Sequence, residues 1–117
     1  MEYKAIHRYA DASARKVRPF AKLIRGRAAD EALELLRFLP NKSARLLESV
    51  VKSALGNAED KGARNLDDLV VIESRVDGGP IMKRIMPRAR GTAYPIKRRY
   101  SHIHITLSDL EEETAVE

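Results

Sequence analysis

The stretch from Gly78 to Ser108 contains seven Lys and Arg residues and not one Asp or Glu, although the whole chain has 17 acidic residues. Asp77-Gly78-Gly79-Pro80 marks its start, Pro87 and Pro95 lie on either side of its middle, and its apolar and basic residues alternate loosely around Gly91. This pattern predicts two extended arms folded back around a tip near Gly91, which is a basic β-ribbon. At about 3.3 Å per residue, arms of about a dozen residues reach roughly 40 Å. Because an unburied hairpin of like charges repels itself, such a ribbon needs a polyanionic partner.

Apolar spacing predicts three helices before the ribbon, over residues 13–24, 30–39 and 42–60. The third helix follows a cap at Asn41, and its apolar residues recur at i, i+3, i+4, i+7, i+8 and i+11 from Leu47, so we expect it to be the central core helix. The first helix has Ser13 as a predicted N-cap and Gly26 as a C-cap signal. Pro19 either kinks this helix or marks its start, because proline removes a backbone donor.

Strands are predicted on both sides of these helices. Residues 2–9 are expected to form an edge strand, and the β-branched run 69–76 leads into the ribbon. The last strand should return to the core, because Ile103, Ile105 and Leu107 alternate with polar residues.

Charge favours a nucleic-acid partner. The net charge is +5, but residues 109–117 alone contain five carboxylates, so the rest of the chain carries +10. An anionic membrane is the competing polyanion, yet only six aromatic residues are available as anchors. The absence of Cys, of a signal peptide and of an apolar run of roughly 20 residues predicts a protein of the reducing cytoplasm.

One face of the first predicted helix carries basic residues and no acidic ones. Arg15, Arg18, Lys22 and Arg25 fall within about 80° of arc, and no carboxylate interrupts them. A merely solvated helix face usually mixes signs, so this stripe favours phosphate contact. A weaker row on the third helix contains Lys42, Arg45 and Lys52.

Signals for catalysis are weak. No Cys nucleophile and no phosphate-binding glycine loop is present, and the adjacent acids Asp67 and Asp68 are typical of a loop. His102 and His104 share one strand face, and His7 would join them in a metal site if the terminal strands paired. A polar strand face beside RNA explains the same histidines without metal. We therefore expect no catalytic residue, cofactor or metal.

Two segments of the chain resemble a known family. The ribbon reads GPIMKRIMPRARG from Gly79 to Gly91 and KRRYSHI from Lys97 to Ile103, and the first helix contains SARKVR from Ser13 to Arg18 and LIRG from Leu23 to Gly26. These motifs resemble the bacterial type of the ribosomal large-subunit protein twenty-two family, in the same order over about residues 2–108. Departures are Thr92, where the family usually has a basic or amide side chain, Ala14 in place of a frequent Pro, and Pro19 in place of an aliphatic residue.

The resemblance implies an α+β fold, with three helices packed on a small antiparallel three-stranded sheet and a long protruding hairpin at about residues 79–101. It implies a non-enzymatic, structural constituent of the large ribosomal subunit that binds 23S rRNA and supports subunit assembly. Implied partners are that RNA, neighbouring ribosomal proteins and the nascent peptide in the exit tunnel, with the protein a monomer in the cytoplasmic ribosome and no membrane involved. The tunnel-facing tip would consist of Arg88, Ala89, Arg90, Gly91 and Thr92. The implied or charge-predicted rRNA contacts are Arg15, Lys16, Arg18, Lys22, Arg25, Lys42, Lys83, Arg84, Arg88, Arg90, Lys97, Arg98 and Arg99.

We expect residues 1–108 to form one domain and residues 109–117 to form an acidic, disordered tail. Two other functions remain open from the residues alone. A basic β-arm with a proline near its tip also suits a DNA-bending architectural protein, which would need a dimer interface. A metal-dependent nuclease using His102 and His104 is the third hypothesis.

Overall fold

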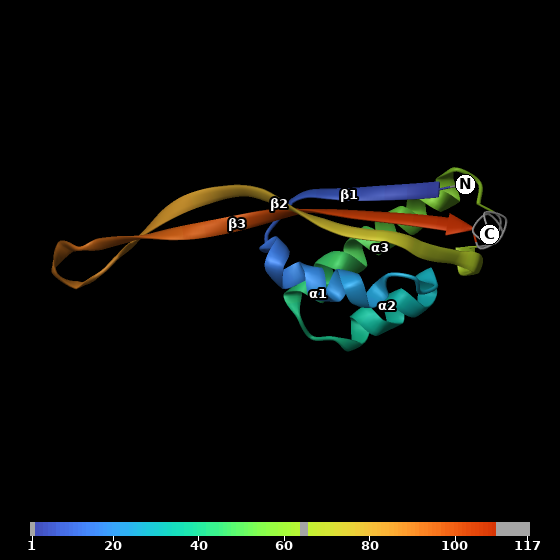
Figure 1. The fold of residues 1–117 in the computed structure, drawn as a ribbon, viewed down its shortest axis with the longest axis horizontal. Coiled ribbons are helices and arrows are strands. Elements are labelled where there is room, and N and C mark those ends of the chain that lie inside the picture. The colour runs from blue at the N-terminus through green and yellow to red at the C-terminus, as the bar shows by residue number, and fades with distance from the viewer. Residues whose placement is uncertain (1, 64–65, 110–117) are drawn as a thin grey trace.

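Three helices cover one face of a three-stranded antiparallel sheet, and two strands of that sheet continue far beyond the helices as a ribbon (Figure 1). This is a computed structural model, and it describes residues 2–63 and 66–109. In chain order the elements are β1 (Glu2–Ala10), α1 (Ala14–Ile24), α2 (Ala29–Phe38), α3 (Lys42–Asp60), a 3-10 turn (Leu66–Asp68), β2 (Leu69–Pro87), a second 3-10 turn (Ala89–Gly91) and β3 (Ala93–Asp109). The α+β class and the three-helix, three-stranded architecture are confirmed.

The last strand in the sequence lies in the middle of the sheet, whose order is β1-β3-β2. β1 pairs only with β3, as expected of an edge strand, in a register that places Ala5 opposite Ile105. The alternate residues Ile103, Ile105 and Leu107 have no exposed surface. Their face of β3 therefore packs against the helices, as the alternation predicted.

The ribbon, residues 79–101, is a continuation of β2 and β3. The predicted core strand leads through Gly78 and Gly79 into the ribbon as the single strand β2, whose register on β3 shifts between Gly78 and Ile81. From there the strands pair regularly from Ile81 opposite Arg99 to Pro87 opposite Ala93. The molecule measures 65 × 26 × 25 Å, and the long axis follows the ribbon (Figure 1).

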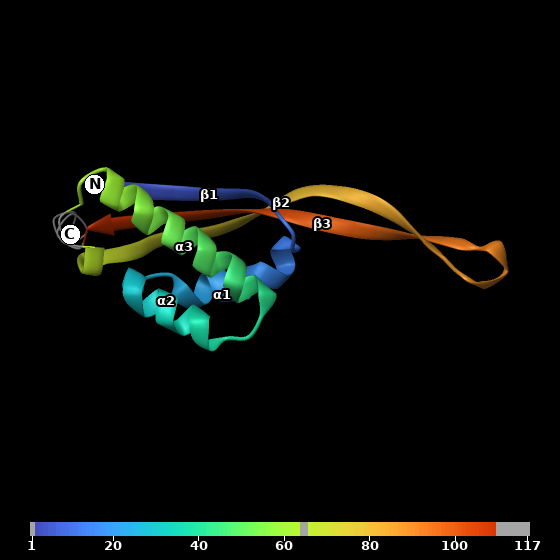
Figure 2. The same cartoon turned by 180° about the vertical axis from the view of Figure 1, so that it is seen from behind.

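Helix α3 supplies much of the core, as the spacing of its apolar residues predicted. Leu47, Val51 and Ala54 have no exposed surface, and α3 packs against β1, β3, α1 and α2. Seen from behind, it runs along the sheet from the root of the ribbon to the opposite end (Figure 2).

Helix α1 begins directly after Ser13 and continues through Pro19. Of the two alternatives for Pro19, a start of the helix at this residue is therefore wrong. Arg15 and Pro19 both lie on the exposed side of α1. Water can reach the Arg15 carbonyl there, so the missing donor of Pro19 leaves no buried unpaired group.

The open edge of β2 is covered by the chain that leaves α1. The Gly26 N–H donates to the Val71 carbonyl at 2.8 Å, and the Val71 N–H donates to the Arg27 carbonyl at 2.9 Å. Gly26 has φ +83°, a left-handed conformation that glycine adopts readily at the end of a helix. The predicted C-cap signal thus turns the chain from α1 onto the edge of the sheet.

β3 ends at Asp109, the first residue of the predicted acidic tail. Residues 110–117, where the rest of that prediction falls, lie outside the described residues. Among the helices of the described residues, none is long and apolar enough to cross a membrane.

Candidate nucleic-acid interface

All seven predicted ribbon cations are exposed. Directly paired residues share a face of a two-stranded ribbon, and neighbours along a strand alternate. The register places Lys83 opposite Lys97 and Arg99 opposite Ile81 on one face, while Arg98 is opposite Met82 and Arg84 opposite Ile96 on the other. Both faces of the ribbon root are therefore basic, and Lys83 and Lys97 repel each other directly.

The cations form two groups along the ribbon. Residues 85–87 and 92–96 contain no Lys or Arg. They separate Arg88 and Arg90 at the tip from the cations nearer the body, which we call the root cations: Lys83, Arg84, Lys97, Arg98 and Arg99. This middle band exposes large apolar side chains: Ile85 is 74% exposed and Tyr94 is 56% exposed. The ribbon therefore presents positive charge at two levels, with exposed apolar side chains between them.

The tip is a tight, internally bonded turn. The Arg88 N–H donates to the Thr92 carbonyl at 2.7 Å, and the Thr92 hydroxyl donates to the Ala89 carbonyl at 2.8 Å. Arg90 and Gly91 both have positive φ, at 63° and 73°. Thr92, which departs from the family pattern, thus closes the turn. The positive φ of Arg90 is strained for a residue with a side chain, and its guanidinium is displayed at the far end of the molecule.

Two of the five α1 cations predicted to bind RNA bond to the sheet. Arg18 Nε donates to the Val76 carbonyl at 3.0 Å, and Arg25 Nη2 donates to the Ser74 carbonyl at 2.7 Å. Because β2 is an edge strand, these carbonyls have no strand partner, and the arginines supply the missing donors. Among the described residues, the side chains of Arg15, Lys16 and Lys22 have no hydrogen bond or ion pair.

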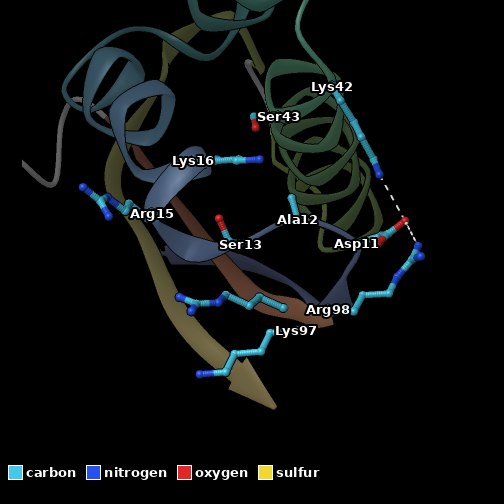
Figure 3. Close-up of a pocket in the computed structure, with 10 residues that line it drawn as sticks. Asp11, Ala12, Ser13, Arg15, Lys16, Lys42, Ser43, Lys97 and Arg98 are labelled. Atoms are coloured by element: carbon cyan, nitrogen blue, oxygen red, sulfur yellow. Dashed lines mark hydrogen bonds and ion pairs between the residues drawn. The ribbon is translucent and has the colours of Figure 1, made fainter. Parts of the chain in front are cut away.

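A basic hollow lies at the root of the ribbon, where α1, α3 and β3 meet (Figure 3). The root hollow has a volume of about 700 Å³. Its cationic lining comes from three segments that are far apart in the sequence: Arg15, Lys16, Lys42, Lys97, Arg98 and Arg99. The structure therefore brings the predicted α1, α3 and ribbon cations to one place.

Asp11 is the carboxylate of the root hollow. Its Oδ2 accepts from Lys42 Nζ at 3.0 Å and from Arg98 Nη2 at 2.8 Å, as the dashed lines in Figure 3 mark. The hydrogen bond from Lys42, followed by that from Arg98, lowers the pKa of Asp11 below its ordinary value. Sequence reasoning missed this residue. A signal was present, because Asp11 is the only acid between Glu2 and Asp30.

The second basic row, on α3, is partly neutralised. Glu48 Oε1 accepts from Lys52 Nζ at 3.0 Å and from Arg37 Nε at 3.4 Å, and the hydrogen bond from Lys52 is the main cause that lowers the pKa of Glu48. Arg45 is exposed. Only Lys42 of this row reaches the root hollow.

The three histidines do not meet. His7 pairs with Ile103, and His104 pairs with Ile6, so His7 faces the helix side of the sheet while His102 and His104 face the other side. His102 Nδ1 accepts from the Tyr9 N–H at 3.1 Å, and His104 Nε2 lies 3.2 Å from Asp77 Oδ2. Within the described part of the chain, no cluster of three or more His, Cys, Asp or Glu residues has the geometry of a metal site.

Comparison with known proteins identifies similar chains. The family model described as ribosomal protein L22p/L17e matches residues 5–108. The large ribosomal subunit protein uL22 of Rhodopirellula baltica is 49% identical over 115 residues, which cover 94% of this chain and 97% of that protein. The proteins of the same name from Akkermansia muciniphila and Desulforamulus reducens are 47% and 49% identical, over 95% and 96% of this chain and 99% of each relative.

Proposed function

The chain belongs to the ribosomal protein L22p/L17e family, and on that premise we propose that it binds 23S rRNA through its ribbon and lines the nascent-peptide exit tunnel with the ribbon tip. A member of this family is a structural, non-enzymatic constituent of the large ribosomal subunit. Neighbouring ribosomal proteins and the passing nascent peptide are the other partners in this proposal. The DNA-bending alternative loses its support. It was inferred from the basic ribbon, and membership of this family accounts for that ribbon.

The observation that carries the proposal is the exposed ribbon with cations on both faces of its root. Two strands without a helix layer are at best marginally stable alone, and the pair Lys83 and Lys97 adds repulsion. Phosphate oxygens would remove this repulsion and accept from the arginine forks. Recognition of this kind follows the shape of folded RNA.

The interface on the body extends this contact. Arg15, Lys16 and Lys22 are exposed on α1, and they remain available to phosphate because their side chains bond to nothing in the described residues. Arg18 and Arg25 instead have a structural role, because their side chains hold α1 to β2.

Charge reversal of a matched pair tests the RNA contact. We expect Lys83→Glu with Lys97→Glu to weaken binding to structured large-subunit RNA strongly and to reduce the slope of log affinity against log salt by about 2. The control is Lys4→Glu with Lys61→Glu, which changes the net charge equally on exposed residues of the body. Equal losses for both pairs would mean that only net charge matters. Binding of duplex DNA as tightly as RNA by the unmodified protein would contradict the proposal itself.

Cross-linking tests the tunnel contact. A photoreactive amino acid in place of Ala89 at the tip should cross-link to a stalled nascent peptide in assembled ribosomes, whereas the same group in place of exposed Lys61 should not. If the two positions cross-link to the nascent peptide equally, the tip does not line the tunnel.

A further inference from the structure

Helices α1 and α3 both begin at the root hollow, and neither beginning is capped. The side chains of the N-cap residues Ser13 and Asn41 make no capping hydrogen bond, and neither helix has an acid in its first turn. The first N–H groups of a helix have no acceptor within the helix. Here the amides of Arg15 and Ser43 are among these free donors, and both residues line the hollow. Two positive helix ends therefore converge on one space.

Ser43 supplies independent evidence that this space is built to hold a ligand. The residue is only 9% exposed and lines the root hollow. Among the described residues its hydroxyl has no hydrogen-bond partner. The hydroxyl therefore keeps its hydrogen-bonding capacity for a group that enters the hollow. In Figure 3 the Lys16 side chain extends from α1 toward α3. The hydroxyls of Ser13 and Ser43 point toward the space around it.

The surrounding charges fit an anion. Asp11 binds Lys42 and Arg98 on one side of the hollow, so those two cations are already partly neutralised. Arg15, Lys16 and Lys97 also line the hollow, and no described residue pairs with their side chains. Cations, free amides and an unpartnered hydroxyl together match the oxygens of a phosphate group.

We propose that the root hollow is a phosphate-binding site, in which the first turns of α1 and α3 and the hydroxyl of Ser43 hold one backbone phosphate of the RNA against the root of the ribbon. This rests on the proposed function, because it names the RNA group that the interface receives. The site would join body and ribbon, since its walls come from both.

The first experiment compares Ser43→Ala with Ser53→Ala, an exposed serine on the same helix. We expect Ser43→Ala to weaken binding to large-subunit RNA by roughly two- to tenfold, since one hydrogen bond to phosphate is lost. The salt slope should not change, because no charge is removed. Thermal stability should stay the same or rise slightly, because the Ser43 hydroxyl makes no hydrogen bond to a described residue and alanine is the better helix former. RNA affinity equal to that of Ser53→Ala, or a loss of stability that accounts for the weaker binding, would overturn the proposal.

The second experiment needs no RNA and uses inorganic phosphate as the probe. In amide NMR spectra of the full chain, the resonances of Arg15 and Ser43 should shift with phosphate and not with chloride at the same ionic strength, and Ser43→Ala should reduce the response of Arg15. The absence of such shifts would overturn the site even if RNA binds through the ribbon. Shifts with phosphate, combined with unchanged RNA affinity of Ser43→Ala, would reduce the hollow to a site for a free ion and would also overturn the proposal. If the ribbon variant Lys83→Glu with Lys97→Glu binds RNA normally, it is the proposed function that fails.

Discussion

Lys22 lies in the last turn of α1 and Arg25 is the C-cap residue that follows it. Both were predicted to bind RNA, yet the structure gives them different roles. Arg25 donates to the Ser74 carbonyl at 2.7 Å, whereas the Lys22 side chain has no partner among the described residues. Replacing Arg25 by Ala leaves the Ser74 carbonyl on the edge of β2 without its donor. An unpaired acceptor costs about 1–3 kcal/mol, and partial access of water places this one at about 1–2 kcal/mol.

Urea unfolding of the free protein measures this difference. With a urea dependence of about 2 kcal/mol per M, within the usual range for small proteins, we expect Arg25→Ala to lower the midpoint by roughly 0.5–1 M. Lys22→Ala should lie within about 0.5 kcal/mol of the unmodified protein, as surface changes usually do. Lys22→Ala should instead lose about one unit of salt slope in RNA binding. Equal effects of the two variants on the urea midpoint would refute the reasoning, because the hydrogen bond to β2 would then contribute nothing.

Two further predictions concern the root of the ribbon. At Gly79, a Cβ would lie 2.9 Å from the Tyr100 carbonyl oxygen, whereas at Gly78 nothing lies within 4 Å. Gly79→Ala should therefore cost about 1–3 kcal/mol in the free energy of unfolding or open the ribbon root, measured by urea unfolding and by amide hydrogen exchange at Ser101, and Gly78→Ala should do so much less. Because Lys42 and Arg98 lower the pKa of Asp11, the stability that Asp11 contributes is fully present above its ordinary pKa, about 3.9, and is lost as the pH falls through its lowered value. The difference in stability between the unmodified protein and Asp11→Asn should thus be constant near neutral pH and narrow below pH 4, and a constant difference down to strong acid would contradict the role of the carboxylate.

Much of the fold follows from local patterns in the sequence. The spacing of Leu47, Val51 and Ala54 predicts the buried face of α3, because 3.6 residues per turn bring them together whatever packs on them. The alternation around Ile105 predicts the inner face of β3 in the same way. Gly26 follows the end of α1 as its C-cap signal predicts, and the core strand continues through Gly78 and Gly79 into the ribbon; the shift of register between Gly78 and Ile81 was not predicted.

Only part of the candidate site could be predicted from the sequence. The ribbon cations are exposed as predicted, since an acid-free basic hairpin has no core to enter. The roles of Arg18 and Arg25 were not visible, because they depend on which edge of the sheet faces α1. His7 also needed the register, which places it on the opposite face from His104.

The sequence by itself determined the sign of the charges, the periodicity of the helices and the family, because these are properties of neighbouring residues. The tertiary structure decided which cations are free. Asp11 meets Lys42 and Arg98 across 31 and 87 residues of chain, and the starts of α1 and α3 meet at the same hollow. Contacts over such separations arise from packing and strand register, which no local pattern encodes, so the acid-free ribbon could be read directly while the hollow at its root could not.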